Sequence, residues 1–228
     1  MKNILARLSL GLIVVATPFF LIMTAVRVLI APWYPQVEYR MPYFPVDSYG
    51  FTLADRLKWS APSIEYLTNN AELSFLGDLQ LQDGTPLYND RELSHMLDVK
   101  KLVKSMILAW EILAAAFVVI LILAWRGRWM PQLGGALENG GKFTITLILC
   151  ILALVAVSFD WLFTMFHRIF FTGDTWIFLY SDTLIRLFPI PFWRDAFILM
   201  GVFTISAAVL LIIFGGRAAR ARQQSQSM

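Results

Sequence analysis

Four long apolar stretches constrain the fold of this chain more than any other feature of its sequence. They cover residues 8–31, 102–125, 143–166 and 195–214. A helix of about 20 residues can cross the hydrocarbon core of a bilayer, and a segment in lipid must satisfy its own backbone hydrogen bonds. We therefore expect an all-α membrane protein with four transmembrane helices. The composition agrees, because 58% of the 228 residues are apolar and only 15% are charged.

The basic residues in the short connecting segments predict the orientation of these helices. Eight of them fall on one side of a four-span arrangement: Lys2, Arg7, Arg126, Arg128, Lys142, Arg217, Arg220 and Arg222. The segment between the third and fourth spans holds three: Arg168, Arg186 and Arg194. By the positive-inside rule both termini, the loop 126–142 and the tail 215–228 are expected in the cytoplasm. Residues 32–101 and 167–194 are then expected on the outer face.

The chain's two histidines lie at the ends of two predicted spans. His95 precedes the second span and His167 follows the third, so a four-span topology predicts that both lie on the same side of the membrane. Asp98 lies three residues after His95 on the same helical face, near enough to hydrogen-bond a ring nitrogen. Asp160 lies two helical turns before His167, on what would be the same face. We interpret both aspartates as supporting groups for the histidines.

The two outer segments are expected to differ in character. Residues 32–101 should be mostly helical, with Ser60 or Ser63 capping a short helix. Asn89, followed three residues later by Glu92, resembles a capping box for the helix that enters the membrane. The segment 167–194 is rich in aromatic residues but interrupted by charges, so we expect an interfacial or re-entrant segment.

Two histidines leave several chemistries open. They could ligate a haem, or form a metal site with Asp98 or Asp174, or act as an acid–base pair because imidazole titrates near pH ~6.5. They could also only hydrogen-bond headgroups or backbone. Cys150 is the only cysteine, which excludes an intramolecular disulfide and a cysteine-based metal site. No basic stripe with interleaved aromatics indicates nucleic-acid binding.

Several motifs around the histidines resemble those of a known family. They are "YGF" at 49–51 followed by Arg56, "YL" at 66–67, "SHMLDVK" at 94–100, "FHRIFF" at 166–171, "DTLIRLFP" at 182–189 and "FWRDA" at 192–196. In this order, over residues 5–215, the chain resembles the bacterial lipoprotein intramolecular transacylases. The two histidine motifs are the most specific part of this resemblance.

The resemblance implies a defined reaction in the bacterial cytoplasmic membrane. The substrate would be a diacylated lipoprotein whose N-terminal cysteine carries a diacylglyceryl thioether and a free amine. The enzyme would move the sn-2 acyl chain to that amine and leave a lyso-form lipoprotein. No metal and no cofactor would be needed, and membrane lipids would surround the site.

The same resemblance implies the roles of the candidate residues. His95 and His167 would be the catalytic acid and base, supported by Asp98 and Asp160. Lys101 or Arg168 could stabilise the oxyanion. The candidate substrate-binding residues are Tyr49, Arg56, Lys101, Arg168, Trp176 and Asp182. A non-catalytic membrane sensor or accessory subunit, which binds a partner through the outer loop, is the alternative hypothesis.

Overall fold

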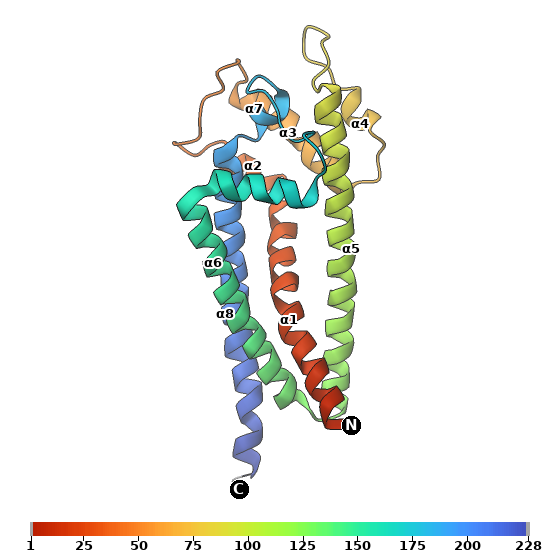
Figure 1. Ribbon diagram of the computed structural model, residues 1–228, viewed down its shortest axis with the longest axis vertical. Coiled ribbons are helices and arrows are strands. Elements are labelled where there is room, and N and C mark those ends of the chain that lie inside the picture. Colours follow the sequence, from red (N-terminus) through yellow and green to blue (C-terminus); the bar gives the residue numbers. More distant parts are fainter. Residues whose placement is uncertain (1, 227–228) are drawn as a thin grey trace. The chain divides into compact units, whose positions relative to one another are not determined.

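The computed structural model describes the backbone of residues 2–226 and the side chains of residues 9–220. Its elements are the helices α1 (Lys2–Leu29), α2 (Trp33–Glu38), α3 (Leu53–Thr68), α4 (Ser74–Gly77), α5 (Asp90–Arg126), α6 (Met130–Phe170), α7 (Thr183–Leu187) and α8 (Ile190–Gln226), shown in Figure 1. Over the described residues the fold is all-α. An isolated antiparallel bridge joins Gln80 to Pro86.

Four of these helices are long and apolar enough to cross a membrane, which confirms the expected all-α membrane fold. The candidate spans are Ser9–Leu29, Asp90–Arg126, Met130–Phe170 and Ile190–Arg220. α5 has 37 residues and α6 has 41. At 1.5 Å per residue each is longer than the ~30 Å hydrocarbon core, so both helices must extend beyond it. The segment 126–142, expected to be a loop, is helical from Met130 onward.

The chain divides into two compact units. The first contains the described parts of Met1–Arg27, Ile107–Ala153 and Ile198–Met228. The second contains Val28–Met106 and Leu154–Phe197, and therefore both histidines. The two predicted outer segments, 32–101 and 167–194, fall entirely within this second unit.

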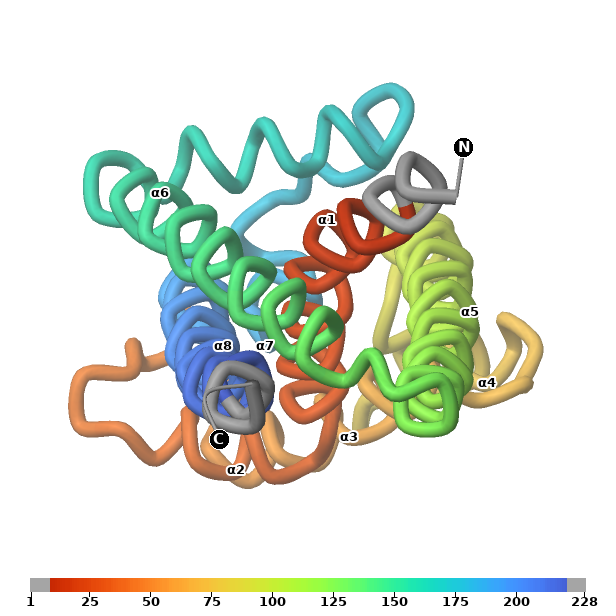
Figure 2. The backbone as a smooth tube through the Cα atoms, turned by 90° about the horizontal axis from the view of Figure 1, so that it is seen from below, coloured from red at the N-terminus to blue at the C-terminus, as the bar shows by residue number. Residues whose placement is uncertain are grey.

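Glycines allow close packing of α6 in the first unit, where Figure 2 shows it beside α8 and α1. A Cβ atom added to Gly134 would lie 2.6 Å from the carbonyl oxygen of Gly215 on α8. A Cβ atom at Gly140 would lie 2.6 Å from the hydroxyl of Thr17 on α1. Small residues let membrane helices approach closely, where dispersion replaces the hydrophobic effect as the driving force.

We expect Gly134→Ala to lower the thermal unfolding midpoint of the purified protein, because the new methyl group meets the main chain of α8. Gly135→Ala is the matched control, since a Cβ atom at Gly135 has no neighbour within 4 Å. The two changes alter helix propensity equally, by roughly 1 kcal/mol in favour of alanine. Tryptophan fluorescence during heating in detergent measures both. Equal midpoints for the two variants would show that the close approach does not limit stability.

The prediction for the start of α3 was wrong. The helix begins at Leu53, and its N-cap is Thr52, whose hydroxyl accepts a hydrogen bond from the Asp55 amide (3.2 Å). The Asp55 carboxylate accepts from the Thr52 amide in return (2.9 Å), which completes a capping box. Ser60 and Ser63 lie inside the helix and are buried. This reciprocal cap, which the sequence interpretation missed, starts the helix earlier.

Candidate functional site

The structure brings the two histidine side chains together inside the second unit. His95 lies in the second turn of α5, and His167 lies near the end of α6. Their ring centroids are 5.9 Å apart and their planes differ by 25°. Each residue is only 8% exposed. The pair therefore occupies one enclosed location, although 71 residues of chain separate its members.

A kink in α6 precedes His167. Ser158 has non-helical backbone angles (φ −161°, ψ 93°). The Ser158 hydroxyl accepts a hydrogen bond from the Trp161 amide (3.4 Å). This is the geometry of an N-cap, so residues 159–170 form a newly capped helical segment that carries His167.

The hydrogen bond of His167 determines which of its nitrogens is free. Its Nδ1 lies 2.7 Å from the main-chain carbonyl oxygen of Phe163. A carbonyl can only accept, so Nδ1 carries the proton in this arrangement. In the neutral ring the Nε2 atom then has a lone pair, which can accept a proton from a ligand.

His95 is held differently. Its Nδ1 is buried and has no hydrogen-bond partner among the described residues. The expected hydrogen bond from the His95 ring to the Asp98 carboxylate is not formed. The Asp98 carboxylate instead lies 3.5 Å from the Lys101 ammonium, and both side chains are substantially exposed. Solvent and the Lys101 ammonium hold this carboxylate away from the buried His95 ring. Because Nδ1 of His95 is buried, Nε2 is the nitrogen that remains for a ligand.

Aromatic side chains of the segment 171–180 cover the imidazole pair. The Phe171 ring lies 5.0 Å from His95 and 5.5 Å from His167. Phe178 lies 5.4 Å from His95, and Trp176 lies 5.0 Å from His167. Trp176 was a candidate from the sequence, whereas Phe171 and Phe178 were missed. The aromatic richness of 167–194 was their only signal, and it did not distinguish individual residues.

Glu92 connects the start of α5 to α7, the short helix that follows this aromatic segment. Its buried carboxylate accepts hydrogen bonds from the Leu184 amide (2.7 Å) and the Asn89 amide (2.8 Å). The Asn89 side chain accepts from the Glu92 amide (3.0 Å), so the expected capping box is present. One carboxylate therefore both caps α5 and holds α7 beside it.

Asp182 has a similar structural position. One carboxylate oxygen accepts from the Leu179 amide (2.8 Å), and the other accepts from the Asn89 side chain (3.2 Å). Both oxygens are therefore already used within the protein. We therefore interpret Asp182 as a residue that holds the end of the segment 171–180 in place, and not as a contact to the substrate.

Arg56 and Tyr49 belong to a second polar cluster in the same unit. The buried Arg56 donates to the main-chain carbonyls of Pro45 (2.6 Å) and Arg186 (3.1 Å). Burial lowers the pKa of Arg56, and the carboxylate of Asp47 opposes that shift. The Tyr49 carbonyl accepts from Arg186 (3.1 Å), while its ring is exposed. The hydrogen bonds described for both residues include neither histidine.

Three further charged candidates are exposed. Asp160 was expected on the same face as His167, but it is exposed while His167 is buried. Arg168 and Lys101 are also exposed, and Lys101 pairs with Asp98. None of the three has a described hydrogen bond to either histidine, so the structure does not assemble them with the imidazole pair.

Metal ligands do not gather at this location. Among the side chains that the structure describes, no group of three or more His, Cys, Asp or Glu residues is placed to hold a metal ion. The chemistry available at the pair is therefore that of two imidazoles with different hydrogen bonding, in an aromatic environment.

The helices define an integral membrane protein, and comparison with known proteins makes it an acyltransferase. The chain belongs to the family of the lipoprotein intramolecular transacylase Lit, whose family model matches residues 11–193. This match covers most of the described chain, including both histidines. It confirms the family resemblance that the sequence motifs indicated.

Solved structures agree with this fold. The chain is similar to the membrane-integral lipoprotein intramolecular transacylase Lit from Bacillus cereus, with a TM-score of 0.81 and 18% identity over 97% of this chain and 99% of that chain. A form of the same protein with a histidine-to-arginine mutation gives a TM-score of 0.76 at 18% identity, covering 98% of this chain and 96% of that one. A protein of Aquifex aeolicus (strain VF5), described as uncharacterized, is 25% identical over 204 residues, covering 90% of this chain and 91% of that protein.

Proposed function

We propose that this transacylase moves the sn-2 acyl chain of an S-diacylglyceryl lipoprotein to the amine of its own N-terminal cysteine, using His95 and His167 as acid–base groups. The observation that carries the proposal is the burial of both imidazoles within 5.9 Å of one another. The family supplies the lipoprotein substrate and the intramolecular transfer. The geometry of the histidines supports the proposed acid–base mechanism.

The reaction needs no nucleophile from the protein. The cysteine amine attacks the ester carbonyl, so that an N–C bond forms, and the ester C–O bond to glycerol then breaks. One proton leaves the nitrogen and one reaches the departing glycerol oxygen. The products are an amide and an alcohol, so atoms and charge balance. Holding the two reacting groups of one molecule together can contribute about 7–11 kcal/mol.

The hydrogen bonding of the rings supports a division of roles. Nε2 of His167 is the better base, because the Phe163 carbonyl keeps the proton on Nδ1. We assign the other transfer, protonation of the glycerol oxygen, to His95 through its Nε2, because its Nδ1 is buried and unpaired. Two separate imidazoles can carry out both proton transfers while the tetrahedral intermediate breaks down. A single ring would have to perform the two transfers in sequence.

The aromatic cover suits a lipid substrate. Phe171, Phe178 and Trp176 surround the rings with apolar surface, which can contact acyl chains and keep water from the ester. Trp176 is therefore our candidate for substrate contact. We assign Arg56, Asp182 and Tyr49 to holding the surrounding loops, since their described polar contacts are to the protein itself.

The site is proposed to lie on the outer face of a bacterial cytoplasmic membrane, with both termini in the cytoplasm. The excess of basic residues in the two terminal segments and in residues 126–142 supports this orientation. On that face the mature N-terminus of a lipoprotein and the headgroup region of its anchor are both accessible.

Mass spectrometry of lipoprotein N-termini tests the proposed function. Cells that lack a transacylase of this kind and express this chain should contain lipoproteins with an N-acylated cysteine and one acyl chain on glycerol. A form of the chain with both histidines replaced by alanine, expressed to the same membrane level, should leave the diacyl form with its free amine. Unchanged diacyl lipoprotein with the native chain would favour a non-catalytic sensor or accessory subunit instead.

A further inference from the structure

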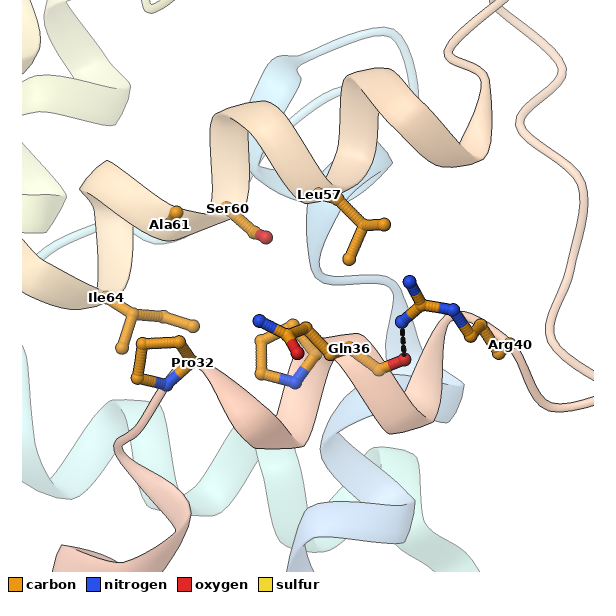
Figure 3. Close-up of a pocket in the computed structure, with 8 residues that line it drawn as sticks. Pro32, Gln36, Arg40, Leu57, Ser60, Ala61 and Ile64 are labelled. Atoms are coloured by element: carbon orange, nitrogen blue, oxygen red, sulfur yellow. Dashed lines mark hydrogen bonds between the residues drawn. The ribbon is translucent and has the colours of Figure 1, made fainter.

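A groove runs between α2 and α3, on elements that do not carry the histidines. Its volume is about 290 Å³. The residues that matter for its chemistry are Pro32 before α2, Gln36 within it and Arg40 in the turn after it, with Leu57, Ser60 and Ile64 from α3 (Figure 3). The proposed acyl transfer does not use this groove.

The two ends of the groove differ in polarity. Pro32 and Ile64 form one end, and Arg40 lies toward the other (Figure 3). Pro32 follows three residues after Leu29, where the candidate membrane span of α1 ends. The apolar end is therefore the end at which the chain leaves a membrane-crossing helix.

Arg40 is the only charged residue among those that line the groove, and no acidic side chain lines it. Its side chain is exposed and donates a hydrogen bond to the main-chain carbonyl of Gln36. Within residues 9–220, no carboxylate forms an ion pair with it. A guanidinium has five N–H donors in a planar fork that matches the oxygens of a phosphate, so most of its donors remain for an anion.

Between these ends the groove offers smaller polar groups. The exposed Gln36 side chain faces its middle, and the buried Ser60 hydroxyl, which also hydrogen-bonds to Tyr39, lies behind it (Figure 3). A ligand that fits this order carries an anionic group, then hydroxyl or ester oxygens, then hydrocarbon. Such a sequence of groups is that of a glycerophospholipid at the surface of a bilayer.

We propose that this groove binds the headgroup of an acidic phospholipid, with Arg40 on the phosphate and the acyl chains leaving past Ile64 and Pro32 toward the bilayer. The lipoprotein substrate implied by the family carries a glycerol thioether and no phosphate, so this ligand is a second lipid and not the substrate. The bound lipid anchors the α2–α3 pair at the membrane surface.

Native mass spectrometry of the full chain in detergent micelles tests this assignment. Dioleoyl-phosphatidylglycerol is titrated against the native protein, with dioleoyl-phosphatidylcholine as the zwitterionic probe. We expect a bound phosphatidylglycerol that phosphatidylcholine does not replace at equal concentration. R40Q should weaken that binding about tenfold, because charge-assisted hydrogen bonds to the phosphate are lost.

Two further variants separate the groove from general surface charge. K58Q removes an exposed cation of α3 that does not line the groove, and it should leave the affinity unchanged. I64W fills the apolar end without changing charge, and it should weaken binding as R40Q does. Native-like thermal midpoints for all variants establish that they fold.

Three results would overturn the proposal. The first is unchanged phosphatidylglycerol affinity in R40Q. The second is an equal loss in K58Q, which would indicate diffuse attraction to a basic surface. The third is displacement of the lipid by glycerol 3-phosphate or inorganic phosphate at millimolar concentration, which would assign the groove to a soluble phosphate ligand. None of these results depends on acyl transfer, so the proposed function stands or fails separately.

Discussion

Replacing His167 with alanine is expected to lower the rate of lyso-product formation by about 10²- to 10⁴-fold, the usual contribution of a positioned general base. His95→Ala should cause a loss in the same range. Each substitution removes one of the two proton-transfer groups and leaves the substrate's own nucleophile in place. Initial rates with the purified enzyme and a synthetic diacylated lipopeptide, followed by mass spectrometry, measure the effect.

Neighbouring residues provide the controls for these variants. Ser94 and Ile169 are exposed residues on the same two helices, so Ser94→Ala and Ile169→Ala should keep native rates. Free imidazole added to either histidine variant should restore part of the rate if the loss is chemical, and none if it is structural. A histidine variant that keeps the native rate would remove that residue from the mechanism.

The properties that follow from local sequence patterns could be predicted. Apolar stretches long enough to cross a bilayer predicted the four helices, because in lipid the backbone of a segment can hydrogen-bond only within the protein. The same count of spans put His95 and His167 on one side, and the structure places them in one compact unit. The Asn89–Glu92 capping box also depends only on residues three apart.

The predictions that were wrong or incomplete concern features that depend on tertiary structure. Spacing allowed Asp98 to reach His95, but burial of the ring and exposure of the carboxylate separate them. Spacing likewise put Asp160 on the face of His167. Both residues follow the kink at Ser158, but Asp160 is exposed, whereas His167 is buried beneath Phe171 and Trp176. Phe171 and Phe178 could not be chosen from many aromatics, because their selection depends on how the segment 171–180 folds back over the histidines.

Glu92 is expected to limit the stability of the second unit more than any charged residue at the site. Glu92→Ala would leave the amides of Leu184 and Asn89 without their acceptor. A buried unsatisfied donor such as the Leu184 amide costs about 1–3 kcal/mol of unfolding free energy. Asn89 is exposed, so the second loss is that of a helix cap, about 0.5–2 kcal/mol, and the two together should cost about 1.5–5 kcal/mol. The free energy of a folded domain is only about 5–15 kcal/mol, so this is a large fraction.

A graded series distinguishes this role of Glu92 from a simple loss of charge. Glu92→Gln keeps one carbonyl acceptor and places an amide donor opposite a main-chain N–H, so its loss should be intermediate. Asp90→Ala removes an exposed carboxylate from the same helical turn and should cost well under 1 kcal/mol, the typical contribution near a helix N-terminus. Thermal unfolding in detergent measures the order of the three variants.

Hydrogen exchange locates the effect in the chain. If Glu92 holds α7 through the Leu184 amide, Glu92→Ala should speed exchange over residues 183–187 and over the segment 171–180 that precedes them, while the amides of residues 107–153 in the first unit stay protected. Acyl transfer should fall with the same variant, because Trp176 and Phe178 would no longer be held over His167 and His95. Unchanged exchange at 183–187 would mean that the buried Glu92 carboxylate does not hold α7. Another contact would then have to hold the aromatic side chains over the histidines.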